Sequence, residues 1–144
     1  MTGCLKMNST ELMGKISLLE DYDEAIGALR ILKSQNSELA KRIAIEILNV
    51  KKGDEYFQAS AFELLYSIDR REAIDFFEAN FSCLSQQVFY SIVESVTEDS
   101  SIADEHLELM KACELIKKKI LTLDSEGLAE LSDVIDWFKK SFAR

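Results

Sequence analysis

The chain has 144 residues, of which 47% are apolar and 30% are charged, and its net charge is −9. This length and balance predict one globular domain whose core needs no disulfide or metal for stability. The excess of acids disfavours binding to nucleic acid or to an anionic membrane surface, because both carry negative charge. There is no proline and there are only five glycines, which favours helices over a strand-rich fold.

The cysteines and the N-terminal segment predict a cytoplasmic protein. Cys4, Cys83 and Cys113 are odd in number and widely spaced, which fits reduced, mostly buried thiols better than a disulfide framework. The sequence has no secretory signal pattern and no apolar run long enough to cross a bilayer. We therefore expect neither export nor insertion into a membrane.

Helix signals follow one another through the first third of the chain. A first helix is predicted over about 9–19, with its apolar side chains on one face. Asp21 is predicted to begin the next helix, since Glu24 three residues later completes a capping-box pattern. Ser37 is then predicted to cap a third helix.

The third helix is predicted to end just before Gly53. Lys51 and Lys52 suit the negative end of a helix dipole, and glycine can adopt the left-handed conformation that ends a helix. Asp54 can cap a fourth helix, whose apolar face begins at Phe57.

A weak internal repeat suggests that similar helical units stack side by side. The segment Asp21-Tyr-Asp-Glu-Ala-Ile26 returns 48 residues later as Asp69-Arg-Arg-Glu-Ala-Ile74, and Ser37 and Ser85 share the same offset. Repetition of helical segments at such a period is typical of solenoids.

The stretch Ala59-Ser-Ala-Phe-Glu-Leu-Leu-Tyr-Ser-Ile-Asp-Arg-Arg-Glu-Ala-Ile74 resembles the helix–turn–helix of HEAT-like repeats. It has small residues, a Leu-Leu pair, a tight turn at an aspartate and a second short helix. The resemblance covers about 37–97. It implies an all-α fold, as a short HEAT-like α-solenoid or helical-hairpin stack of about seven to eight helices.

The last part of the chain predicts a pair of helices that caps this stack. A long helix is expected over about 107–121 and a final one over about 125–142. An apolar stripe at intervals of three and four marks the final helix: Leu128, Leu131, Ile135, Phe138 and Phe142. We therefore predict a single helical domain over 1–144, with repeat-like helices over about 9–97 and a C-terminal helical pair over about 101–144.

Catalysis and metal binding have few candidate residues. His106 is the single histidine, and a cysteine nucleophile would need it beside Cys83 or Cys113. The acidic stretch 94–108 lacks the glycine of a calcium-binding loop, and the residue three before His106 is an alanine rather than the glutamate of a di-iron motif. We predict no enzyme activity, no cofactor and no metal.

The negative charge is concentrated in the middle of the chain. Between Arg71 and Lys111 lie 39 residues with nine acids and no Lys or Arg, so the remaining acids and bases of the chain balance. Such segregation steers a basic partner toward one region. The alternative is that this region is a solvated face that serves solubility alone.

Aromatic residues gather beside the same interval. Phe76-Phe77 and Phe89-Tyr90 are adjacent pairs, and neighbours on a helix point about 100° apart. One member of each pair is therefore a candidate interface anchor, with Phe77 and Tyr90 as the choices. The alternative is a helix that is buried on two sides, as in a stacked solenoid.

In size, charge and helical repetition the chain is similar to immunity proteins of bacterial toxin–immunity systems, such as contact-dependent growth inhibition. The resemblance implies a small helical inhibitor that covers the active site or the nucleic-acid groove of a basic nuclease toxin. Segment 72–108 would carry the toxin-binding residues, and these are Asp75, Phe77, Glu78, Tyr90, Glu94, Glu98, Asp99, Asp104, Glu105 and Glu108. A helical adaptor that binds a host protein or peptide is the alternative, and an enzyme that uses Cys83 or Cys113 is a third hypothesis.

Overall fold

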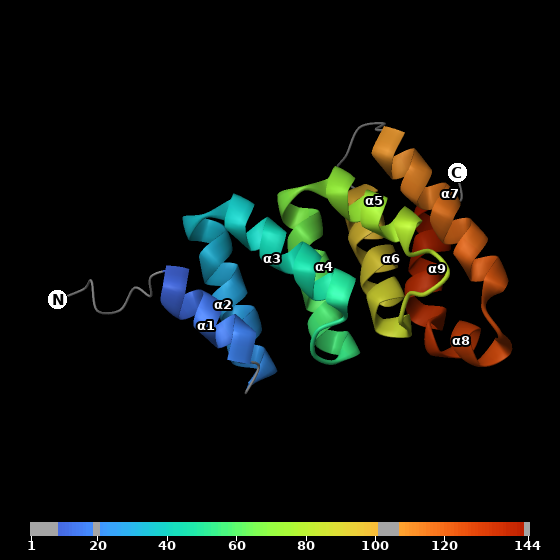
Figure 1. Cartoon of the computed structure of the whole chain (residues 1–144). Helices are drawn as coiled ribbons and strands as arrows, with labels where there is room; N and C mark the ends of the chain where they lie inside the picture. Colours follow the sequence, from blue (N-terminus) through green and yellow to red (C-terminus); the bar gives the residue numbers. More distant parts are fainter. Residues whose placement is uncertain (1–8, 19–20, 101–106, 143–144) are drawn as a thin grey trace.

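The computed structural model describes residues 9–18, 21–100 and 107–142, and this part of the chain is all-helical. Nine helices follow one another in it, with α1–α2 at one end of the molecule and α7–α9 at the other (Figure 1). Their bounds are α1 Ser9–Leu18, α2 Tyr22–Gln35, α3 Ser37–Val50, α4 Glu55–Ile68, α5 Arg70–Ala79, α6 Gln86–Ser100, α7 Leu107–Thr122, α8 Ser125–Glu130 and α9 Ser132–Phe142. The prediction of an all-α stack is confirmed.

The helices form a central row with flanking helices. In the central row, α4 packs between α2 and α6, and α6 also packs on α9. The flanking helices α1 and α3 pack against α2, α3 also packs against α4, and α7 packs against α5 and α6. The largest buried side chains lie between the central row and the flanking helices, and they include Phe57, Phe62, Phe77, Phe89 and Phe138.

Aspartate caps set the helix boundaries in the first half. The carboxylates of Asp21, Asp54 and Asp69 accept backbone N–H groups in the first turns of α2, α4 and α5, as the sequence predicts. The prediction for Ser37 is wrong, because Asn36 caps α3 by accepting the N–H of Leu39. Asn36 precedes the predicted cap by one residue, so Ser37 is the first residue of the helix.

Two further boundaries differ from expectation. Lys51 takes the left-handed conformation that ends α3, and Gly53 follows with φ 75°, so the turn has two left-handed residues rather than one. The predicted final helix is divided at Leu131, where α8 ends and α9 begins. The division turns Leu128 out of the apolar stripe, and it is exposed, whereas Leu131, Ile135 and Phe138 are buried.

Candidate protein-binding surface

A row of polar side chains along α4 borders hollows on both of its sides. Ser60, Glu63 and Ser67 follow at intervals of three and four, so they share one face of the helix. An acidic hollow of about 610 Å³ opens between α4 and α6. Two others open toward α2, a middle hollow of about 500 Å³ and an aromatic hollow of about 360 Å³. Ser60 borders both hollows on the α2 side, and Glu63 and Ser67 border the middle and acidic hollows.

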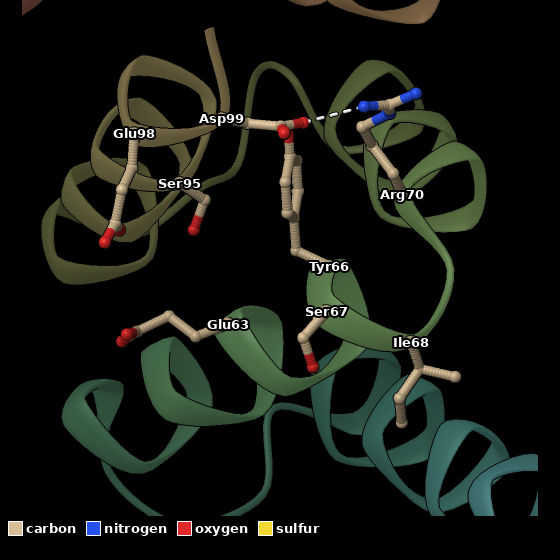
Figure 2. A pocket seen from close by; sticks show the side chains of 8 residues that line it. All are labelled: Glu63, Tyr66, Ser67, Ile68, Arg70, Ser95, Glu98 and Asp99. Atoms are coloured by element: carbon tan, nitrogen blue, oxygen red, sulfur yellow. Dashed lines mark hydrogen bonds and ion pairs between the residues drawn. The ribbon is translucent and has the colours of Figure 1, made fainter. Parts of the chain in front are cut away.

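A hydrogen-bonded group closes one side of the acidic hollow (Figure 2). Asp99, near the end of α6, accepts a hydrogen bond from the Tyr66 hydroxyl at 2.9 Å and from Arg70 Nη1 at 2.8 Å. Burial and the bond to Asp99 raise the pKa of Tyr66 well above its usual value. Asp99 is therefore compensated within the chain, and it ties the end of α6 to the junction of α4 and α5.

Two glutamates, Glu63 of α4 and Glu98 of α6, line the other side of the hollow. Glu94 of α6 lies close enough to both for their charges to act on its pKa. We call these three residues the glutamate cluster. Burial raises the pKa of Glu94, and the charges of Glu63 and Glu98 raise it further. Ser91 donates a hydrogen bond to Glu63 at 3.2 Å. Among the described residues, no Lys or Arg forms an ion pair with Glu63 or Glu94. The fold thus holds like charges together.

Two of the predicted acids lie away from this cluster, on α5. Asp75 and Glu78 flank Lys111 of α7, whose Nζ is 3.7 Å from the Asp75 carboxylate and 2.7 Å from that of Glu78. In the sequence Lys111 only ends the acidic interval. In the folded chain it crosses to α5 and compensates two of its acids.

The prediction of Phe77 as an exposed anchor is wrong, because its side chain is fully buried. Its ring lies 6.1 Å from Phe81 and 6.2 Å from Phe89, measured between centroids. The physical reason is helical register, since Phe77 shares the buried face of α5 with Ala73 and Ile74. The second candidate anchor, Tyr90, is half-buried and packs against the core.

The remaining predicted acids lie around the break between α6 and α7. Asp104 and Glu105, together with His106, lie outside the described residues. Glu108 is half-buried in the first turn of α7, and its charge contributes to the raised pKa of Arg70 after the larger effect of the hydrogen bond to Asp99. Of the predicted partner-binding acids, Glu98 and Asp99 line the acidic hollow. Glu94 lies close enough to Glu98 for the Glu98 charge to raise its pKa.

Glu63 is the member of the cluster that the sequence analysis missed. It lies outside the interval between Arg71 and Lys111 and reaches the cluster only because α4 packs on α6. A signal for it exists in the sequence, since Tyr56, Ser60, Glu63 and Ser67 form a stripe of polar and amphipathic residues on one face of an otherwise apolar helix.

The two cysteines of the described residues differ in exposure, since Cys83 is exposed and Cys113 is buried. Burial raises the pKa of the Cys113 thiol to about 11, so this sulfur is protonated at neutral pH and is a poor nucleophile. No group of metal-ligating side chains gathers in the described ranges. None of the helices described there has the length and apolar character needed to span a membrane.

Comparisons of the chain with protein-family models, with curated proteins and with solved structures gave no match.

Proposed function

We propose that the chain is a non-enzymatic immunity protein, which neutralises a basic nuclease toxin by placing the glutamate cluster against the toxin's phosphate-binding surface. The observation that supports this is the crowding of Glu63, Glu94 and Glu98 on one face, with a raised pKa at Glu94. A carboxylate with a raised pKa is less stable when ionised than the same group in water.

A cationic partner would remove this electrostatic cost. A Lys or Arg side chain between the three glutamates favours their ionised forms, so part of the repulsion present in the free protein becomes binding free energy. Nucleases present such cations, because they must hold phosphates. The acidic face would therefore occupy the site that a nucleic-acid backbone takes in the active toxin.

The acids on the α5 side contribute less to this binding. Asp75 and Glu78 already share Lys111, and Asp99 already holds Arg70. A partner would have to displace these internal cations before it gained the same carboxylates. We accordingly assign the binding surface to α4 and α6 and not to the whole interval 72–108.

The test is co-expression with the product of the adjacent gene, with cell growth and complex formation as readouts. If that product is a toxin, the wild-type chain restores growth and forms a complex that weakens as salt rises. The triple variant Glu63→Gln, Glu94→Gln, Glu98→Gln should associate more slowly and protect poorly. A matched control, Glu46→Gln, Glu114→Gln, Glu126→Gln, makes the same change in net charge at three other exposed positions and should protect like wild type.

Two results would contradict the proposal. Equal protection by the two triple variants would show that the glutamate cluster is not the binding surface. A neighbouring product that is not toxic, together with binding to an unrelated host protein or peptide, would identify the chain as an adaptor.

A further inference from the structure

The aromatic hollow lies at the opposite end of α4 from the acidic hollow. It is bordered by the first turns of α2 and α4, and its described lining consists of Asp21, Tyr22, Asp23, Ile26, Asp54, Tyr56, Phe57 and Ser60. Two of its rings are open to solvent, since Tyr56 is 62% exposed and Tyr22 is 40% exposed. Tyrosine is a common anchor of protein interfaces, so these two rings are candidate contact residues.

The turn before α4 lies against the rings of Tyr22 and Phe57. Gly53 has φ 75°, and a Cβ added there would lie 2.7 Å from Phe57 Cδ2 and 3.2 Å from Tyr22 Cε1. The backbone at Gly53 thus lies closer to the Phe57 ring than a residue with a Cβ could without a shift, and it also lies close to the Tyr22 ring. Tyr22 stacks on Phe57 with a centroid distance of 5.5 Å and an interplanar angle of 30°. The wall of the hollow that Tyr22 and Phe57 form is therefore preformed, which lowers the cost of binding.

The charge balance of the hollow favours a cation over an anion. Two helix N-termini face it, and each is equivalent to about half a positive charge. Three carboxylates oppose them, from Asp21, Asp23 and Asp54, and no Lys or Arg is among the described lining residues. Asp21 and Asp54 also occupy the N–H groups of Glu24 and Phe57, which an anion would otherwise bind. Roughly two negative charges remain.

We propose that the aromatic hollow binds an arginine side chain of the protein partner. A guanidinium group can stack its flat face on a tyrosine ring while its N–H groups donate to a carboxylate. Lysine fits less well, because its ammonium group is compact, strongly hydrated and unable to stack. The inference rests on the proposed function in one respect, which is that the partner is basic, and it adds a second contact point at the other end of α4.

The test uses a small probe, so it does not depend on the identity of the partner. The isotope-labelled protein is titrated with N-acetyl-arginine amide, and backbone amide shifts are followed by NMR. The matched control is N-acetyl-citrulline amide, a neutral molecule of nearly the same shape. We expect the arginine probe to shift the amides of Tyr22, Gly53 and Tyr56 in a saturable way, and the citrulline probe to shift them much less.

Variants then locate the contact. Tyr56→Leu should lower the affinity for the arginine probe two- to fivefold, which corresponds to the loss of about 0.5–1 kcal/mol from an exposed cation–π contact. Asp23→Asn should weaken it as well, because the hollow loses one negative charge. Tyr56 and Asp23 are exposed, so neither change removes core packing. Glu98→Gln, at the acidic hollow, should leave the shifts around Tyr56 unchanged.

Three outcomes would overturn the inference: equal shifts with arginine and citrulline, arginine shifts confined to the glutamate cluster, or full binding by Tyr56→Leu. These outcomes leave the proposed function intact if the triple glutamate variant still fails to protect cells from the toxin. Conversely, arginine binding at Tyr56 combined with full protection by that triple variant would reject the acidic surface and retain the aromatic site.

Discussion

The acidic side chains of α5 and those of the α4–α6 face lie close together in the sequence and differ in what surrounds them. On α5, Asp75 and Glu78 share the cation of Lys111, and these pairs join α5 to α7. On the α4–α6 face, Glu94 lies among Glu63 and Glu98, and its pKa is raised. Asp75 and Glu78 thus have a cation of the chain beside them, whereas Glu63 and Glu94 form no ion pair with any described Lys or Arg. Whether an acid has a cation beside it depends on the packing of the helices. The number of acids in an interval of the sequence does not show this.

The largest effect should come from the core beneath the α5 acids. Phe77→Ala removes a fully buried ring between Phe81 and Phe89, and we expect a loss of about 3–5 kcal/mol in the free energy of unfolding. Urea denaturation measures it. The exposed ring of Tyr56 gives the control, since Tyr56→Ala should change stability little. A loss below that of the control would mean that Phe77 is a surface anchor after all.

A smaller effect is expected at the boundary between the two regions. Asp99→Ala leaves Arg70 and the Tyr66 hydroxyl without their acceptor, which should cost about 1–2 kcal/mol because the pair is only partly buried. Arg70→Gln and the double variant complete a thermodynamic cycle in denaturant. Additive effects in that cycle would show that the two side chains do not stabilise one another and that Asp99 belongs with the partner-binding acids.

The third prediction concerns stability and pH at the glutamate cluster. Because the folded pKa of Glu94 is raised, ionisation of this group opposes folding at neutral pH, and the penalty disappears as pH falls below the unfolded pKa. Glu94→Gln should therefore stabilise the free protein slightly at pH 7, and by less near pH 4. Thermal melts across this range measure the difference, with Glu46→Gln as control. A destabilised Glu94→Gln protein would contradict the account of the cluster.

The smallest effect is expected at Lys111. Its pairs with Asp75 and Glu78 are exposed to solvent, and exposed pairs contribute little to stability. Lys111→Met should lower the melting temperature slightly at low salt and leave it unchanged at high salt. The same variant should speed association with a basic partner only slightly, through the more negative net charge of the protein, because α5 lies outside the proposed binding surface. A large increase in the association rate would indicate that the α5 side contacts the partner.

Local signals predicted most of the fold. The caps at Asp21, Asp54 and Asp69 depend on residues three positions apart, so the sequence alone identifies them. Phe77 shows where the prediction failed although the information was present. Its spacing from Ala73 already assigns it to the buried face, and adjacency to Phe76 was the weaker criterion.

The candidate site was harder to predict than the helices, because it depends on contacts between them. Glu63 joins Glu94 only through the packing of α4 on α6. Lys111 reaches Asp75 across 36 positions of the sequence. No local sequence pattern predicts either contact. A count of charges along the chain places Glu63 outside the acidic interval, although the fold brings it close to Glu94.

The small hydroxyl residues on α4 have a consequence for how such a protein can diversify. Ser60 and Ser67 border hollows along a helix whose buried side chains include Phe62 and Leu65. A larger or charged residue at either serine would reshape the neighbouring hollows while the core stays as it is. Under the proposed function, substitutions at these two positions would change the shape that a partner meets and leave the buried packing of Phe62 and Leu65 in place.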